Sequence, residues 1–266
     1  MDVSSGESTG PAPVLRVADF SKSYGKAVAV SGLSFDLPPG AILGMAGPNG
    51  AGKTTTLRSI TGILAPSEGR IEIDGHDITR QPMEAKRALA YVPDDPRLFD
   101  TLSVWDHLRF TARAYGVRNW KEKAEKLLDH FALREKRKSP ASDLSRGMRQ
   151  KTAICCALLH QPKLALFDEP LTGLDPRGIR LIKQTILNLA QSGSAVILSS
   201  HLLQLVEGLC DHLLIMHRGR CRFFGTMGQA RELLMSTGET LEEAFLRLTE
   251  TEESAQSDIT PPPPLA

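Results

Sequence analysis

Short apolar segments separated by turn residues fill the first third of the chain, which is typical of β-structure. Val, Leu and Phe recur between residues 14 and 35, where glycines interrupt them. After the turn Pro38-Pro39-Gly40, an apolar segment over 41–46 predicts a buried strand. Glycines, a helical pattern over about 53–62 and a further strand pattern over 70–74 follow. We therefore predict an N-terminal antiparallel β lobe beside a strand-loop-helix unit.

The rest of the chain alternates strand and helix patterns after a purely helical middle. That middle has the spacing of three helices, over 104–115, 120–131 and 145–159. Beyond it, strand patterns at 163–167, 195–199 and 212–216 alternate with helical patterns at 177–190 and 202–209. Strands separated by helices imply parallel βαβ units. The sequence thus predicts an α/β fold with a parallel sheet and an α-helical insertion over about residues 95–160.

Composition narrows the class of protein. The 266 residues include 32 Lys and Arg against 31 Asp and Glu, a net charge of +1, and 41% are hydrophobic. These values argue against wholesale disorder, and a neutral chain makes a dedicated nucleic-acid binder a poor hypothesis. No apolar run approaches the roughly 20 residues of a membrane-spanning helix. The four cysteines form no CxxC pair, which favours a reducing compartment.

Both ends of the chain have compositions typical of disorder. Residues 1–13 are rich in Ser, Gly and Pro and lack the apolar core of a secretory signal. Residues 249–266 are acidic and then contain four consecutive prolines. We expect a disordered leader over 1–13, one ordered domain over 14–248 and a disordered tail over 249–266.

A glycine-rich loop separates the strand at 41–46 from the helix that follows it. Its sequence GPNGAGKT fits the pattern GxxxxGK[ST], in which backbone N–H groups and a helix N-terminus bind phosphate. We expect Lys53 to reach the β- and γ-phosphates of a nucleoside triphosphate and Thr54 to bind Mg²⁺. A tight turn without a ligand is the alternative interpretation. The candidate phosphate-binding residues are Gly47, Pro48, Asn49, Gly50, Ala51, Gly52, Lys53, Thr54 and Thr55.

Acidic residues follow the strand at 163–167. Asp168 is suited to holding Mg²⁺, and Glu169 to accepting a proton from a water that attacks the γ-phosphate. Asp94 and His201 also follow strand-like segments. We predict Asp94 as a catalytic residue and metal ligand, and His201 as a catalytic residue that orients the attacking water. The alternative is a set of solvated strand ends.

These motifs together resemble those of the ATP-binding cassette (ABC) ATPases. The segment LSRGMRQ at 144–150 resembles the family's signature motif LSGGQ. Tyr24, Asp175 and His201 match its aromatic, D-loop and switch-histidine positions. The resemblance covers about residues 14–248, with the motifs in the family's order. It implies a P-loop NTPase core, ATP and Mg²⁺ as cofactors, and hydrolysis of ATP to ADP and phosphate.

The resemblance also implies roles that need two copies of the domain. Tyr24 would stack on adenine, and Ser145 and Gly147 would face the γ-phosphate held by a second ABC subunit. Asp175 would lie at the interface between the two. Two copies of this chain would then close head-to-tail around two ATP molecules.

Three positions depart from the family pattern. Asp94 stands where the family usually has Gln, and Asp adds a negative charge near Asp168 and Glu169. Arg146 and Met148 replace a glycine and the glutamine of the signature motif. This form resembles the branch that pairs with separately encoded, export-type membrane subunits, and residues 241–248 are similar to its closing helix.

The resemblance leads to a functional hypothesis. The chain would be the ATP-hydrolysing subunit of an ABC transporter, cytoplasmic and bound to the inner face of the membrane through separate transmembrane permease subunits. A soluble ABC ATPase acting on ribosomes or DNA is the alternative. Such proteins usually carry two cassettes or a long coiled-coil insertion, and this sequence shows neither.

The helical insertion is strongly basic, with 13 Lys and Arg against 5 Asp and Glu between Arg109 and Lys151. A solvated surface of paired charges explains this composition. A face turned toward permease subunits or anionic lipid headgroups is the alternative interpretation. In the second interpretation, Leu98, Phe99 and Leu102 are candidate apolar contacts.

Overall fold

The computed structural model describes residues 11–172, 174–201, 203–234 and 239–254. Most of the expected leader and the tail from residue 255 lie outside the described residues, as do Gly173 of the D-loop segment and Leu202.

The centre of the molecule is a six-stranded sheet in the order β10-β9-β3-β8-β7-β6. The strands from β9 to β6 are parallel, and β10 pairs antiparallel with β9 at one edge. Because the central strands run in one direction, their carboxyl ends meet at one edge of the sheet. The strands are β3 (Ile42–Ala46), β6 (Leu89–Val92), β7 (Leu164–Asp168), β8 (Ala195–Ser199), β9 (His212–His217) and β10 (Arg220–Thr226).

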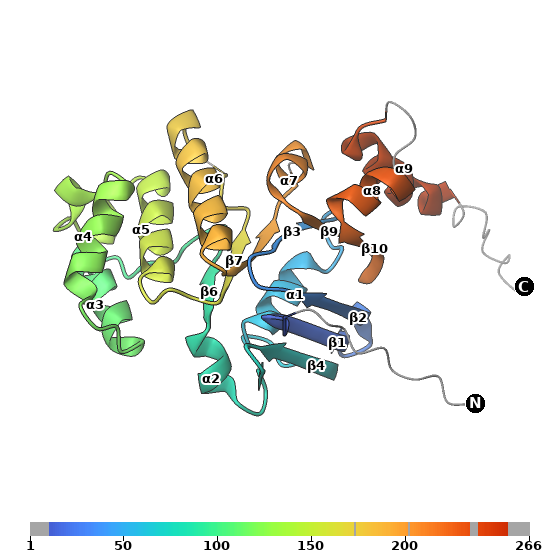
Figure 1. Cartoon of the computed structure of the whole chain (residues 1–266), viewed down its shortest axis with the longest axis horizontal. Helices are drawn as coiled ribbons and strands as arrows, with labels where there is room; N and C mark the ends of the chain where they lie inside the picture. Colours follow the sequence, from blue (N-terminus) through green and yellow to red (C-terminus); the bar gives the residue numbers. More distant parts are fainter. Residues whose placement is uncertain (1–10, 173, 202, 235–238, 255–266) are drawn as a thin grey trace, which may run out of the picture.

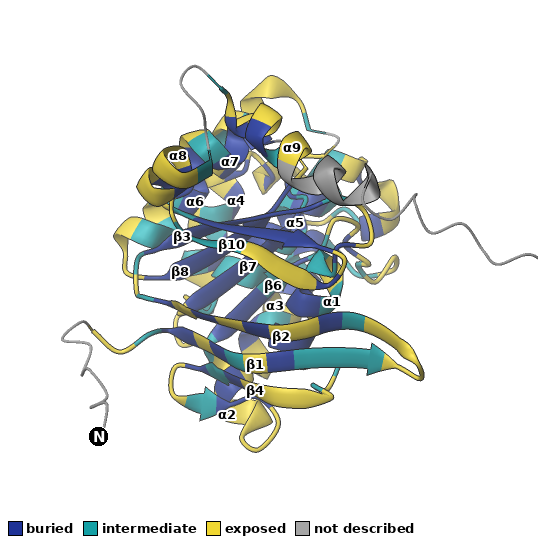
Figure 2. Ribbon diagram, turned by 90° about the vertical axis from the view of Figure 1, so that its right-hand side faces the viewer, coloured by how far each residue is buried: buried dark blue, intermediate teal, exposed yellow. Residues whose placement is uncertain are grey.

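A second, antiparallel sheet forms the N-terminal lobe and packs on one face of the central sheet (Figure 2). Its order is β2-β1-β4-β5, and residues along β1 face Leu37 to Ala27 of β2 and Ile73 to Glu68 of β4. These strands are β1 (Leu15–Tyr24), β2 (Ala27–Leu37), β4 (Glu68–Ile73) and β5 (His76–Asp77).

Three helices of the insertion, α3, α4 and α5, form one end of the molecule (Figure 1). Two short 3₁₀ turns, Arg134–Lys136 and Ala141–Asp143, connect α4 to α5. The helices of the described chain are α1 (Lys53–Ile60), α2 (Pro82–Arg87), α3 (Val104–Ala114), α4 (Trp120–His130), α5 (Arg146–Leu158), α6 (Pro176–Gln191), α7 (Leu203–Leu209), α8 (Met227–Leu234) and α9 (Leu241–Ser254).

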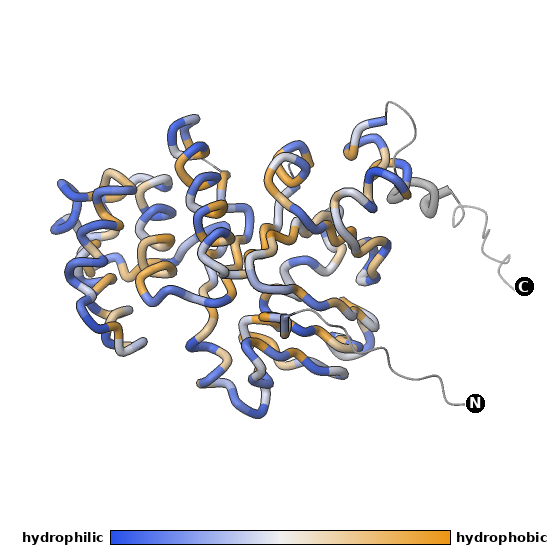
Figure 3. The backbone as a smooth tube through the Cα atoms, in the orientation of Figure 1, coloured by the Kyte–Doolittle hydropathy of each residue, from blue (hydrophilic) through white to orange (hydrophobic). Residues whose placement is uncertain are grey.

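Both faces of the central sheet are buried, because successive side chains of a strand point to opposite faces. In β3, Ile42 and Ala46 join the core shared with the insertion, α6 and α7. Leu43 and Met45 join the core shared with the β lobe and α1. The backbone coloured by hydropathy is accordingly hydrophobic along the central strands, whereas hydrophilic residues cover the outer turns of the insertion (Figure 3).

The predicted fold class is confirmed, with element ends shifted by a residue or two. The sequence pattern missed α2, β10 and α8. The six residues of α2 are too few to show a helical period, and the exposed Arg220, Cys221 and Arg222 hide the pattern of an edge strand. Helix α9 continues to Ser254, past residue 248, where we expect the ordered domain to end. Glutamates in this segment retain good helix propensity.

Candidate nucleotide site

The glycine-rich loop connects the carboxyl end of β3 to the first residue of α1. Two glycines are required by this geometry. A side chain at Gly47 would place its Cβ 2.4 Å from the carbonyl oxygen of Met216. Gly52 precedes α1 with a φ of 103°, a conformation that side chains rarely adopt. The backbone therefore curls tightly around the start of α1, as phosphate binding by N–H groups requires.

Lys53 folds back into this loop. Its ammonium donates to the carbonyl oxygens of Gly47, at 2.5 Å, and Pro48, at 3.2 Å. Burial lowers the pKa of Lys53, while the charges of Glu169 and Asp168 act in the opposite direction. The structure thus brings the lysine and both predicted carboxylates within electrostatic range. Thr54, next along α1, has an exposed side chain.

Asp168 ends β7 and is buried at the edge of the sheet where the glycine-rich loop lies. The hydroxyl of Tyr91, on the neighbouring strand β6, donates to Asp168 Oδ2 across 3.4 Å. Burial raises the pKa of Asp168, and the neighbouring charge of Glu169 raises it further. A buried carboxylate of this kind is suited to a cation, because a positive charge would offset the cost of its burial.

Glu169 and His201 form a hydrogen-bonded pair. Glu169 Oε1 accepts the backbone N–H of His201 at 3.0 Å, and Oε2 lies 2.9 Å from Nδ1 of the same histidine. A second donor to Oε2 is the hydroxyl of Ser200, at 3.4 Å. Glu169 has a φ of 47°, an uncommon conformation for a residue other than Gly, Asn or Asp. Such strain is found most often at functional sites, where the surroundings hold it.

Asp94 lies just beyond β6 and pairs with Arg146, whose Nη2 is 3.2 Å from Asp94 Oδ1. Both side chains are about half exposed. The charge of Asp94 also raises the pKa of Asp168, although less than the burial of Asp168 does. Asp94 and Arg146, two of the three residues that depart from the family pattern, therefore contact one another. Asp94 is also close enough to Asp168 for their charges to interact.

The remaining predicted residues lie on separate elements. Tyr24, at the end of β1, is 50% exposed, and the ammonium of Lys22 lies 5.4 Å from its ring centroid. Ser145 precedes α5 and accepts the N–H of Met148 at 3.3 Å. Asp175 precedes α6 and accepts the N–H of Gly178 at 2.8 Å.

Ser145 and Asp175 thus cap α5 and α6, because each accepts an N–H group that has no partner within its helix. Ser145 and Gly147 belong to the helical insertion, whereas the phosphate loop belongs to the sheet core (Figure 1).

Sequence reasoning missed the polar partners of the carboxylates: Tyr91, Ser200 and Arg146. Ser200 follows β8 and directly precedes His201, which the sequence did select. Tyr91 lies near the end of β6, three positions before the selected Asp94. Strand position is therefore the signal that would have identified them, since polar groups at these ends converge.

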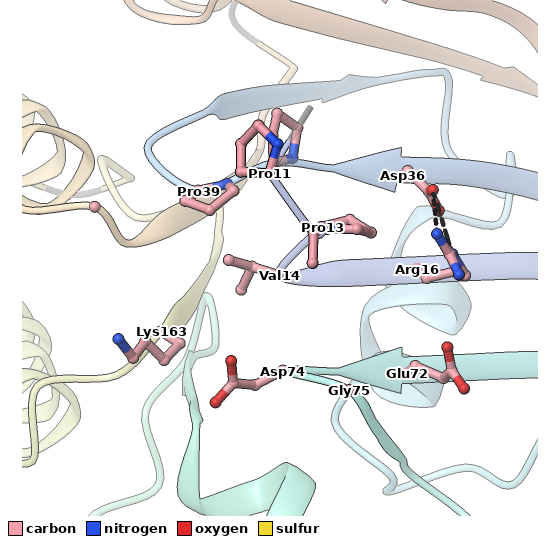
Figure 4. Close-up of a pocket in the computed structure, with 13 residues that line it drawn as sticks. Pro11, Pro13, Val14, Arg16, Asp36, Pro39, Glu72, Asp74, Gly75 and Lys163 are labelled. Atoms are coloured by element: carbon pink, nitrogen blue, oxygen red, sulfur yellow. Dashed lines mark hydrogen bonds and ion pairs between the residues drawn. The ribbon is translucent and has the colours of Figure 1, made fainter. Parts of the chain in front are cut away.

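A large cavity of 1270 Å³ lies elsewhere (Figure 4). Its lining includes the Arg16–Asp36 ion pair and Lys163, and none of its lining residues within the described chain belongs to the predicted site. Lys163 and Gly193 precede β7 and β8, so this cavity lies at the amino ends of the strands, away from the phosphate loop.

A parallel sheet, a strand that runs into a glycine-rich loop and helix, and carboxylates at the end of a nearby strand define the class of P-loop nucleotide-binding proteins. Residues 30–172 match the family description "ABC transporter". Together with the relatives described next, this match places the chain in the ABC transporter family.

Similar proteins align with most of the chain. The ABC-type transporter ATP-binding protein EcsA of Bacillus subtilis (strain 168) is 36% identical over 240 residues, which are 89% of this chain and 96% of that protein. The linearmycin resistance ATP-binding protein LnrL of the same strain is 35% identical over 215 residues, 80% of this chain and 69% of that protein. A solved ATP-binding subunit of an ABC transporter superposes with a TM-score of 0.85 at 34% identity, over 88% of this chain and 99% of that chain.

Proposed function

We propose that this chain hydrolyses ATP to ADP and phosphate and that this reaction drives separate transmembrane permease subunits. The observation that carries the proposal is the Glu169–His201 pair, within electrostatic range of the lysine of the phosphate loop. The backbone N–H groups of the loop and the ammonium of Lys53 would bind the phosphates.

The oxygen atoms present fit a magnesium site. The Thr54 hydroxyl and the Asp168 carboxylate would hold Mg²⁺, with Asp94 as a further proposed contact. Mg²⁺ usually takes one or two protein carboxylates together with waters and substrate phosphates. The described residues contain no cluster of three or more His, Cys, Asp or Glu side chains that could hold a metal ion. Bound Mg²⁺ would supply positive charge to the phosphate oxygens.

The chemical step depends on Glu169. Its carboxylate would accept a proton from the water whose oxygen attacks the γ-phosphorus, while the bond from that phosphorus to the bridging oxygen of ADP breaks. His201 donates two hydrogen bonds to this carboxylate, from its backbone and its ring. These bonds fix the direction in which the carboxylate accepts the proton. With a proton on both ring nitrogens, Nε2 of His201 would donate a hydrogen bond to the γ-phosphate.

One chain would not complete the site. We propose that Ser145 and Gly147, at the start of α5, contact the γ-phosphate of a second copy, that Tyr24 stacks on adenine and that Asp175 lies between the copies. The start of a helix favours an anion there.

The permease would contact a groove between β6 and the insertion. The groove has a volume of 310 Å³, and its lining includes Leu98, Phe99, Phe110 and Tyr115. Phe99 and Phe110 are more than half exposed, which is unusual for large apolar side chains grouped together. An apolar segment of a membrane subunit would cover them. Within the described chain, no helix is both long and apolar enough to cross a bilayer.

Glu169→Gln tests the catalytic assignment. The amide keeps the size of the side chain but cannot accept the proton, so hydrolysis should fall by about 100-fold or more. ATP binding should persist, and the bound ATP should hold two chains together, which light scattering would detect as a doubled mass.

Glu122→Gln is the matched control, because Glu122 is an exposed residue of α4 paired only with Lys126 in the described structure. It should leave turnover unchanged. Turnover by Glu169→Gln at the wild-type rate would contradict the role of Glu169 as the base.

A further inference from the structure

We propose that Tyr91 is a positioning residue of the nucleotide site: its hydroxyl fixes the orientation in which Asp168 binds a divalent cation. This inference rests on the proposed function and assigns a role to a residue outside the motifs that the sequence selected.

The geometry places the tyrosine hydroxyl beside the carboxylate. Strand β6 runs parallel to β7 with Tyr91 opposite Leu166, so Asp168 is two residues further along the neighbouring strand. The Tyr91 side chain packs against the core between the sheet, α1 and the β lobe, which is the side of the sheet that carries the phosphate loop. From there its hydroxyl reaches Asp168 Oδ2 across 3.4 Å.

The chemistry of the pair makes Tyr91 the donor. An ionised carboxylate can only accept a hydrogen bond, whereas a phenol hydroxyl has one proton to donate. The contact of 3.4 Å is therefore a hydrogen bond from Tyr91 to Asp168. With Oδ2 held in this way, the carboxylate keeps one orientation toward a cation. Hydrogen bonds that orient a metal-binding carboxylate typically change metal affinity or activity by about 10- to 100-fold.

Tyr91 also lines the groove proposed for the permease, together with Ala90 and Pro93. A single residue at the end of β6 thus contacts both the groove and the buried carboxylate. Displacement of this strand end would move the hydroxyl relative to Asp168.

The test removes one oxygen atom, with Tyr91→Phe. Mn²⁺ binding to the protein saturated with a nonhydrolysable ATP analogue is measured by electron paramagnetic resonance of the free ion. We expect the Kd for Mn²⁺ to rise about 10-fold, while the Kd for the analogue without metal stays within about twofold, since the phenol does not face the nucleotide. Retained binding of the metal-free analogue shows that the variant site is folded.

Tyr115→Phe is the matched control, because Tyr115 lines the same groove but stacks on His160, with ring centroids 3.9 Å apart. It should leave the Kd for Mn²⁺ unchanged. An unchanged Kd in Tyr91→Phe would overturn the inference while leaving the proposed function intact. Failure of the wild-type chain to bind Mn²⁺ with the analogue would instead overturn the magnesium site of the proposed function.

Discussion

At the scale of single residues, Asp94 and Arg146 form an ion pair with one another. Each departs from the family pattern that the sequence resembles, and the structure pairs them across 3.2 Å. An exposed ion pair contributes little stability, typically about 0–1 kcal/mol. The ion pair matters here because it connects the loop after β6 with Arg146, the first residue of α5. Asp94 therefore has two possible contacts, Arg146 and the magnesium site.

Two substitutions that break the same ion pair separate these contacts. Arg146→Gln removes the pair but leaves the Asp94 carboxylate, whereas Asp94→Asn removes both the pair and a candidate metal ligand. We expect Asp94→Asn to lower Mg²⁺-dependent turnover more than Arg146→Gln does, and to leave ATP binding without metal unchanged. The measurement is turnover as a function of Mg²⁺ concentration. Equal effects of the two variants would show that Asp94 acts only through Arg146.

At the scale of elements, the sequence predicts the helices of the insertion but not which of its apolar side chains are exposed. Val104, Leu108 and Ala112 recur four residues apart along α3 and are buried in the core of the insertion. Phe99 and Phe110 look equally apolar in the sequence, yet they are exposed and their rings lie 6.0 Å apart. Periodicity identifies a buried face, but an apolar residue outside that face is recognised only when the packing is known.

A charge in the groove tests whether the permease covers it. Phe110→Asp replaces a ring that is 58% exposed, so the fold and the basal ATPase rate of the isolated chain should persist. Co-purification with the membrane subunit should be lost, since a carboxylate would be buried against an apolar segment. Leu233→Asp, on α8 and 74% exposed, is the control and should retain the partner. Loss of the partner in both variants, or in neither, would contradict the proposed surface.

At the scale of the whole molecule, the two proposed phosphate-binding elements belong to different parts of the chain. The phosphate loop lies at the carboxyl end of β3, whereas Ser145 and Gly147 begin α5 in the helical insertion (Figure 1). A symmetric pair of chains would bring the loop of one copy to the helix of the other, and twofold symmetry would build two such sites.

Mixing two inactive variants tests this arrangement. Lys53→Ala removes a phosphate contact, and Gly147→Asp puts a negative charge at the proposed contact with the second copy's phosphate. Neither variant alone should hydrolyse ATP. Their mixture should recover turnover, because a mixed pair contains one site with both Lys53 and Gly147 intact.

The control mixture combines Lys53→Ala with a chain that carries both substitutions. Every site then lacks Lys53, so turnover should stay absent. A mixture of the two single variants that remains inactive would contradict a site shared between copies.

The sequence by itself determined the fold class and the phosphate loop, because both depend on local patterns. The alternation of strand and helix patterns recurs along the chain, and the motif GPNGAGKT is complete within eight consecutive residues. Asp168 and Glu169 could be predicted in the same way, since they lie at the end of the buried strand β7.

Only the tertiary structure decided what these residues contact. Tyr91 is 77 positions from Asp168 and Arg146 is 52 from Asp94, and no sequence spacing indicates that they meet. Their contacts arise because parallel strands bring distant segments together at one edge of the sheet and the insertion returns beside β6. Hydrogen bonds and ion pairs depend on distances of about 3 Å in space, whereas the patterns in the sequence record only separation along the chain.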